Sequence, residues 1–271
     1  AQFANVTKMA QGDFGRFGAA LVDLGNNFAT TESAIMNMAT RLGAAGAQVG
    51  LTQPQILGFA TALSSVGLEA EAGGTAWFHK LDITSPETVD ALFADTKEKW
   101  GSIDVLVNNA QASASGVTLA DHTTDQFDLA IYSGLYATFY YMQACYPYLK
   151  ETKGSVINFA SGAGLFGNLG QCAYAAAKEG IRGLTRVAAT EWGPDGINVN
   201  VVCPLAWTAQ LENFEKQYPD AFKANVKMPP AGHYGNVETE IGRACVQLSS
   251  PDFKFMSGET ITLEGGMGLR P

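Results

Sequence analysis

A tyrosine and a lysine four residues apart, with a serine upstream, are the side chains of this sequence best suited to carry out a reaction. Tyr174 and Lys178 fall on a predicted helix, so both project from one face and can approach a common point. Ser161 lies 13 residues before Tyr174, at the end of a predicted strand. A phenol is a poor base at neutral pH, but a nearby ammonium group favours the phenolate and lowers its pKa.

These three side chains together indicate one type of chemistry. A phenol with a lowered pKa can exchange a proton with the oxygen of an alcohol or a carbonyl, while a serine hydroxyl holds that same oxygen by a hydrogen bond. We therefore expect Tyr174 to act as general acid and base, Lys178 to tune it, and Ser161 to orient the substrate. The predicted reaction interconverts an alcohol and a carbonyl, and it needs a hydride carrier.

Strands and helices alternate from residue 77 onward. The expected strands are "WFHKLDI", "DVLVNNA", "SVINFAS" and "INVNVVCP", and the expected helices cover residues 86–100, 125–149 and 173–192. This alternation predicts βαβ units, and hence an α/β fold with a parallel sheet and helices on both faces. Ligands of such sheets bind beyond the carboxyl ends of the strands. The candidate residues there are Asp82, Asn108, Asn109, Ala110, Ser161 and Pro204.

Residues 77–271 resemble the short-chain dehydrogenase/reductase family in five ordered motifs. These are "LDI" at 81–83, "VNNA" at 107–110, Ser161 with "AYAAAK" at 173–178, "INVNVVCP" at 197–204 and "SGETITLEGGM" at 257–267. The resemblance implies a Rossmann-like, doubly wound parallel sheet and a nicotinamide cofactor, either NAD or NADP. It also implies that Lys178 holds the nicotinamide ribose and that the catalytic set is Ser161, Tyr174 and Lys178.

The resemblance further implies a set of cofactor-binding residues. Asp82 and Ile83 would border the adenine, Asn108 and Ala110 would line the cofactor strand, and Thr208 would meet the carboxamide. The full expected set is Asp82, Ile83, Asn108, Ala110, Tyr174, Lys178, Pro204 and Thr208. The substrate would be a small, apolar alcohol or ketone, and the protein a homo-oligomer (dimer or tetramer) that assembles through the aromatic-rich helix and the Tyr174 helix.

Three positions depart from the family pattern. Gly134, in "YSGLYATF", stands where the family usually has an asparagine that completes a proton relay through water. Gln111 and Leu205 stand where glycines usually follow "NNA" and Pro204. We therefore expect an incomplete relay that Gly134→Asn would restore, and altered backbone contacts to the cofactor.

The first 76 residues differ from the rest of the chain. They contain no Trp, Tyr, His or Cys, whereas all 4 Trp, 9 Tyr, 3 His and 4 Cys follow them. Residues 5–76 resemble phage tail tape-measure proteins in "VDLGNNFATTESAI", "GLTQPQILGFATALSSVG" and "EAEAGGTA". The same residues can also be laid on the opening of a dinucleotide-binding fold, with 19–24 as its first strand. We divide the chain into 1–76, a largely helical segment in the place of the nucleotide-binding half, and 77–271, the catalytic portion.

The turn that would hold the cofactor phosphates has one glycine where the family has three. Gly25 takes the first glycine position, but Ala29 and Thr31 take the next two, and their side chains keep phosphates from the backbone. Glu32 in the first helical turn would repel them. We expect weak or absent cofactor binding, with a dissociation constant above roughly 1 mM. Gln53, at the ribose position, does not distinguish NAD from NADP.

Composition excludes several other classes of function. A net charge of −9 and a pI near 4.8 argue against nucleic acid as a partner. The sequence has no apolar run long enough to span a membrane, and its four separated cysteines form no Cys-x-x-Cys pair, so we expect a soluble cytoplasmic protein with free thiols and no metal site.

Two alternatives to an enzyme come from the N-terminal segment. The chain could be a non-catalytic chimeric remnant or interaction module, in which a tape-measure fragment has replaced the nucleotide-binding half. A phage tail structural protein is the other alternative, and it conflicts with the Ser161, Tyr174 and Lys178 set.

Overall fold

The computed structural model describes residues 77, 79 and 81–268. The expectations for residues 1–76, including those for Gly25, Ala29, Thr31 and Glu32, lie outside the described residues. The chain divides into two compact units, which we describe separately. One contains His79–Leu205, Pro229–Gly235 and Arg243–Pro271, and the other contains the remainder, of which Trp77, Ala206–Met228 and Asn236–Gly242 are described.

The first unit is built on a parallel sheet, as the alternation of strands and helices predicts. Its strands are β1 (Val105–Asn108), β2 (Ser155–Phe159), β3 (Asn198–Pro204) and β4 (Thr260–Leu263). They lie in the order β1-β2-β3-β4, and every neighbouring pair is parallel. The central strands β2 and β3 are buried almost throughout, which suits their runs of β-branched residues.

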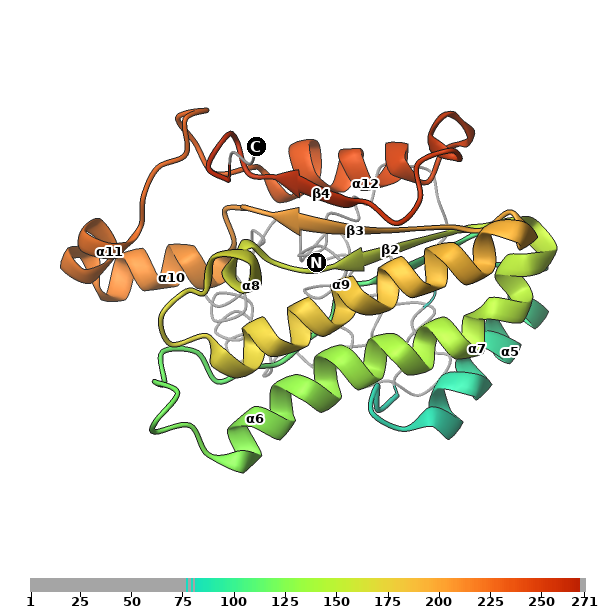
Figure 1. Cartoon of the computed structure of the whole chain (residues 1–271), viewed down its shortest axis with the longest axis horizontal. Coiled ribbons are helices and arrows are strands. Elements are labelled where there is room, and N and C mark those ends of the chain that lie inside the picture. Colours follow the sequence, from blue (N-terminus) through green and yellow to red (C-terminus); the bar gives the residue numbers. More distant parts are fainter. Residues whose placement is uncertain (1–76, 78, 80, 269–271) are drawn as a thin grey trace, which may run out of the picture. The chain divides into compact units, whose positions relative to one another are not determined.

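Helices cover both faces of this sheet (Figure 1). One face carries α5 (Pro86–Trp100), α7 (Ala137–Thr152) and α9 (Cys172–Trp192), and the other carries α12 (Arg243–Leu248). Successive strand residues point to opposite faces, so Val156 packs into the core beneath α7 and α9, while Ile157 packs against Cys245 of α12. The expected α/β fold is confirmed.

Local sequence signals explain where the helices begin and end. Helix α5 has the predicted bounds, because Pro86 occupies its first turn and Gly101 ends it with a left-handed φ of 82°. Helix α6 (Thr124–Ala130) begins at a capping box, in which Thr123 and Gln126 each bond the other's backbone N–H. Shorter segments complete the unit: α8 (Gly162–Phe166), η3 (Gly193–Asp195) and η5 (Pro251–Phe253).

Two predicted elements need correction. The helix expected over residues 125–149 is interrupted by a π-helical turn, η2 (Ile131–Tyr136), which joins α6 to α7. Such turns often occur at functional sites, and this one contains Gly134. The strand expected at "WFHKLDI" is not formed at its described residues 77, 79, 81 and 82. A strand needs a hydrogen-bonded neighbour, and the described part of the chain provides none for this segment.

The described part of the second unit is helical. It contains α10 (Ala209–Gln217), α11 (Pro219–Asn225) and the π-helical η4 (Val237–Gly242). Thr208 begins α10, where its hydroxyl accepts a hydrogen bond from the Leu211 N–H at 3.3 Å. Trp207 and Phe214 both contact the ring of Phe222, with centroid distances of 6.1 Å each.

Several exclusions made from composition can be compared with the structure. The four cysteines are all free thiols, as expected. Burial raises the pKa of Cys145 to about 12 and that of Cys245 to about 11, so both stay protonated. Within the described residues, no group of His, Cys, Asp and Glu side chains could hold a metal ion, and no helix is long and apolar enough to cross a membrane.

Candidate active site

Ser161, Tyr174 and Lys178 meet beyond the carboxyl end of β2. Ser161 follows that strand and begins α8, where its hydroxyl accepts a hydrogen bond from the Ala163 N–H at 3.1 Å. Tyr174 stands in the first turn of α9, with its phenol close enough to the Ser161 hydroxyl for that hydroxyl to lower the pKa of the phenol. Lys178 stands one turn further along, with its Nζ 5.4 Å from the centroid of the Tyr174 ring. The structure therefore brings together the three residues that the sequence selected.

Lys178 is fixed by its surroundings. Only 4 % of its surface is exposed, and its Nζ donates a hydrogen bond of 2.8 Å to the backbone carbonyl of Phe159, the last residue of β2. Burial disfavours the charged form and lowers the pKa of Lys178 to about 8. The side chain is therefore mostly an ammonium at pH 7 and loses its proton as the pH rises through about 8.

The pKa of Tyr174 differs from the value expected from sequence. A neighbouring ammonium predicts a lowered pKa, but the pKa of Tyr174 is raised, because burial of the phenol disfavours phenolate. The hydrogen bond from Ser161 acts in the opposite direction and lowers the pKa. The buried thiol of Cys203, at the end of β3, also lies close enough to influence both Tyr174 and Lys178.

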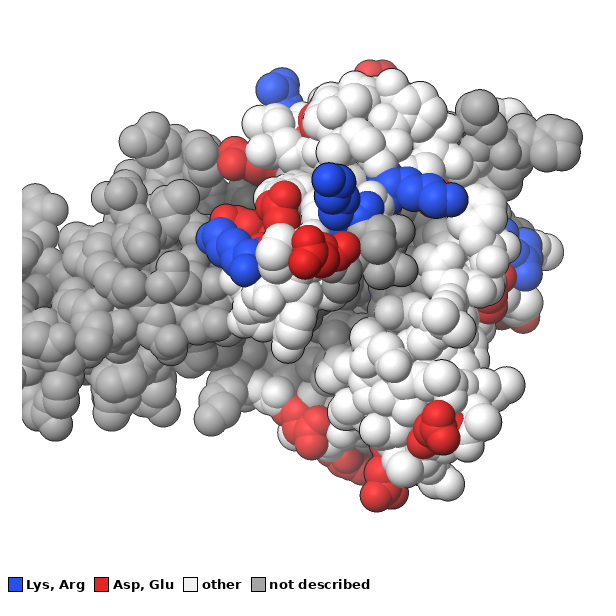
Figure 2. All heavy atoms as spheres, turned by 90° about the vertical axis from the view of Figure 1, so that its left-hand side faces the viewer, with Lys and Arg blue, Asp and Glu red and all other residues white. Residues whose placement is uncertain are grey.

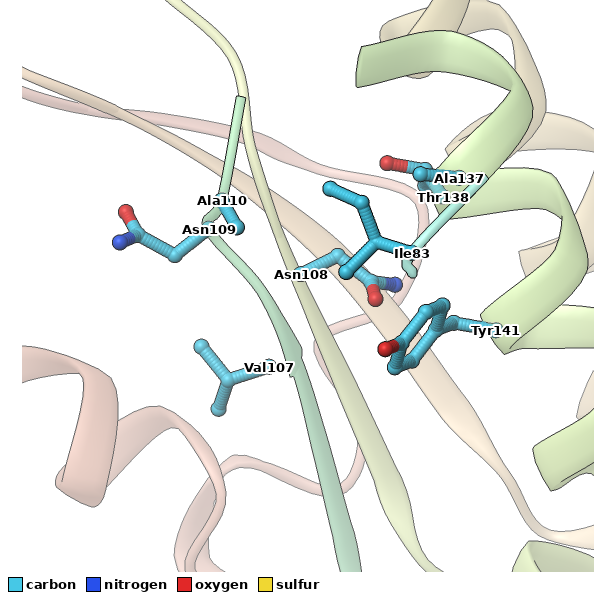
Figure 3. Close-up of a pocket in the computed structure, with 8 residues that line it drawn as sticks. All are labelled: Ile83, Val107, Asn108, Asn109, Ala110, Ala137, Thr138 and Tyr141. Atoms are coloured by element: carbon cyan, nitrogen blue, oxygen red, sulfur yellow. The ribbon is translucent and has the colours of Figure 1, made fainter. Parts of the chain in front are cut away.

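Three of the predicted cofactor residues line one pocket. Ile83, Asn108 and Ala110 share it with side chains from β1 and α7, including Thr138 and Tyr141 (Figure 3). The side chain of Ile83 extends toward Ala110, with the amide of Asn108 and the phenol of Tyr141 nearby, so the pocket has an apolar wall with polar groups beside it (Figure 3). The sequence did not indicate Thr138 and Tyr141, because only the packing of α7 beside β1 brings them to this place.

The remaining predicted cofactor residues do not line this pocket. Asp82 turns its carboxylate to Thr84, accepting bonds of 2.9 Å from the N–H and 2.7 Å from the hydroxyl, which lower the pKa of Asp82. Pro204 ends β3, paired in register with Leu263 of β4. Thr208 belongs to the second unit, where it caps α10.

Gln111 and Gly134, two residues that differ from the family pattern, are in contact. Gln111 follows β1, and its side-chain amide lies over Gly134, so that a Cβ at position 134 would fall 2.6–2.9 Å from three amide atoms. The sequence does not reveal this contact, because the two positions lie in different elements and are 23 residues apart.

The surface at the carboxyl ends of the strands carries no concentrated charge. Figure 2 shows this side of the molecule, where the described Lys and Arg side chains stand near Asp and Glu side chains, further Asp and Glu side chains lie apart from them, and broad areas are uncharged. Nucleic-acid binding depends on clustered basic residues, and the described part of this surface does not offer such a cluster.

Comparison with known proteins identifies the family. The family model described as enoyl-(acyl carrier protein) reductase matches residues 29–268. The chain therefore belongs to the short-chain dehydrogenase/reductase family, a family of nicotinamide-dependent oxidoreductases, as the five motifs indicated. The match also extends over most of the segment that resembles tape-measure proteins, although it begins after Gly25.

Individual relatives are oxidoreductases acting on alcohols and carbonyls. The chain is 75% identical over 173 residues to a 12alpha-hydroxysteroid dehydrogenase of Clostridium sp., covering 64% of this chain and 67% of that protein. It is 31% identical to levodione reductase of Leifsonia aquatica, covering 84% of this chain and 87% of that protein. Among solved structures, ElxO with NADP bound has a TM-score of 0.65 and 27% identity, covering 70% of this chain and 77% of that chain.

Proposed function

We propose that the protein interconverts a hydroxysteroid and its ketone with NAD or NADP, using Ser161, Tyr174 and Lys178. The observation that supports this most strongly is the meeting of these three side chains beyond the end of β2. The high identity to a 12alpha-hydroxysteroid dehydrogenase supports the choice of a steroid.

The proposed mechanism assigns one task to each side chain. When bound, the nicotinamide supplies or takes up the hydride. Tyr174 takes the proton from the substrate hydroxyl during oxidation and returns it to the carbonyl oxygen during reduction. Ser161, whose hydroxyl lies near the phenol of Tyr174, holds the same substrate oxygen. Lys178 places a positive charge beside the phenol and stabilises its phenolate, which offsets part of the effect of burial.

The described residues fit the adenine part of such a cofactor. The pocket of Ile83, Asn108 and Ala110 combines apolar walls with polar side chains, as a planar heterocycle requires. The amide of Asn108 is fixed within this pocket, since it donates a bond of 2.8 Å to Asn158 Oδ1. We propose that Ile83 borders the adenine, that Asn108 and Ala110 line the cofactor strand beside it, and that Lys178 holds the nicotinamide ribose.

An apolar substrate agrees with the segment between Ser161 and Tyr174. Leu169 is 92% exposed there, and Phe166 is 53% exposed. Large apolar side chains beside a candidate active site are suited to the rigid hydrocarbon surface of a steroid.

Steady-state oxidation of a 12α-hydroxysteroid tests this function. The comparison uses the same steroid without that hydroxyl and a short-chain alcohol, each with NAD⁺ and NADP⁺ at high concentration. We expect turnover of the hydroxysteroid alone, with product identified as the ketone by mass spectrometry. Absence of turnover with both cofactors would refute the proposal and favour a non-catalytic remnant.

The pH dependence of oxidation tests the role of Lys178. Lys178→Ala removes the charge beside Tyr174, so the pKa of the phenol should rise further. The pH profile of kcat should then shift to higher pH, by about one pH unit for each ~1.4 kcal/mol by which the phenolate is less stabilised. The Michaelis constant for the cofactor should also rise. The matched control is Lys150→Ala, which removes the 2.8 Å ion pair with Asp195. An unchanged profile in Lys178→Ala would show that the lysine does not tune the phenol.

We also propose a homo-oligomer that assembles through an aromatic face of η2 and α7. Tyr132, Tyr136 and Phe139 are each 40–47% exposed, and the rings of Tyr132 and Tyr136 stack with centroids 5.0 Å apart. Exposed aromatic groups of this kind favour protein contacts. Sedimentation velocity of the protein and of Tyr136→Glu checks this, and a monomer in both would contradict it.

A further inference from the structure

Gln111 and Gly134 form a close contact that neither position explains alone. The side chain of Gln111 fills the space over Gly134, with Cδ 2.6 Å, Nε2 2.7 Å and Oε1 2.9 Å from the place of a Cβ. Real Cβ atoms do not approach other heavy atoms so closely, so Gln111 can keep this position only because residue 134 is a glycine.

The amide of Gln111 is buried and only partly bonded. Its Nε2 donates a hydrogen bond of 3.3 Å to the carbonyl of Ala130, the residue just before the π turn. Its Oε1 is buried and has no hydrogen-bond partner among the described residues. A buried amide oxygen normally accepts a hydrogen bond, so Oε1 is available to a donor outside the described residues.

The loop that carries Gln111 is tied to the π turn by a second residue. Ser133 Oγ accepts a bond of 3.0 Å from the Ala112 N–H and lies 3.1 Å from the Ala112 carbonyl. The π turn in turn packs against α9, where the side chain of Leu135 lies over Gly180, two residues beyond Lys178. A change at Gln111 can therefore reach the helix that holds Tyr174 and Lys178.

We propose that Gln111 and Gly134 are a compensating pair, in which the amide of Gln111 supplies from the loop the polar group that the π turn lacks at position 134. Gln111 is then a positioning residue. It accepts a hydrogen bond at Oε1 and keeps the π turn packed against α9, so that Tyr174 and Lys178 stay correctly placed. This role in turnover rests on the proposed function. It also predicts a loss and not a gain of activity for Gly134→Asn, because the new side chain would displace the amide of Gln111.

A cycle of variants tests the pair. Gly134→Asn should lower the melting temperature by about 4 °C or more and kcat at least about tenfold, and adding Gln111→Gly should restore most of both. The control is Gly183→Asn in α9, where an added Cβ meets no described atom within 4 Å and should cost little. If the losses in melting temperature simply add in the double variant, the two positions are independent and the inference is wrong.

Gln111→Met separates the polar role from space filling, since methionine has a similar length and no amide. We expect it to keep the melting temperature while lowering kcat about tenfold, leaving the Michaelis constant for the steroid within about twofold and shifting the pH profile. Unchanged kcat and pH profile would overturn the positioning role. If the unaltered protein turns over no steroid, the proposed function is wrong. The melting temperatures of the single and double variants then decide by themselves whether Gln111 and Gly134 compensate each other.

Discussion

Replacing Tyr174 by phenylalanine is expected to lower kcat by at least about 10³-fold, which corresponds to roughly 4 kcal/mol of transition-state stabilisation. The substitution removes one hydroxyl and nothing else, so the proton transfer is lost while the ring keeps its place. The structure supports this, because the phenol lies near the Ser161 hydroxyl and beside the Lys178 ammonium. Turnover is measured by the change in nicotinamide absorbance with a hydroxysteroid.

The control for this experiment removes a phenol hydroxyl elsewhere. Tyr146 donates a hydrogen bond of 2.6 Å to Asp195, which follows the end of α9 opposite to Tyr174, so Tyr146→Phe loses a phenol hydrogen bond away from the candidate site. It should lower stability slightly and leave kcat unchanged. If Tyr174→Phe retains turnover within about tenfold of the parent protein, Tyr174 is not the acid and base.

Cofactor affinity is the second large effect that we expect. Gly25 keeps the first of the three glycine positions of the family's phosphate turn, but Ala29 and Thr31 replace the second and third, and their side chains keep phosphates from the backbone N–H groups. We therefore expect a dissociation constant above roughly 1 mM for NADH and NADPH, or about −4 kcal/mol of binding free energy, against micromolar constants for ordinary enzymes. The family match begins at residue 29 and so leaves Gly25 outside it.

Calorimetric titration measures these constants directly. Ala29→Gly combined with Thr31→Gly should tighten binding, because it returns the backbone access that phosphates require. A micromolar constant for the unaltered protein would show that residues 19–33 form a working cofactor turn and that the missing glycines do not matter.

The sequence predicted the regular elements of the catalytic portion well. Helix α5 and the strands β1, β2 and β3 lie where alternation and helix-end signals placed them. These predictions worked because each depends on a local pattern: proline and glycine at the ends of α5, and short β-branched runs for the strands. The Tyr174 and Lys178 spacing also worked, since one helical turn separates the two side chains.

Other features depend on contacts between distant segments, which one sequence does not reveal. The π turn at η2 interrupts a run that looks continuously helical, and it places Gly134 beneath Gln111. The raised pKa of Tyr174 reflects burial, which the sequence alone could not weigh against the charge of Lys178. Asp82 was predicted to bind the cofactor from the end of a strand, but its carboxylate accepts hydrogen bonds from Thr84.

Transfer of deuterium tests most directly whether this protein moves a hydride between a nicotinamide and a steroid carbon. The ketosteroid is incubated with NADH or NADPH deuterated at both hydride positions of the nicotinamide, at millimolar concentration, with the unaltered protein and with Tyr174→Phe. We expect the unaltered protein to form the alcohol with one deuterium on the carbinol carbon, and Tyr174→Phe to form almost none. An alcohol without deuterium, equal yields from both proteins, or no alcohol with either cofactor would contradict the proposed function.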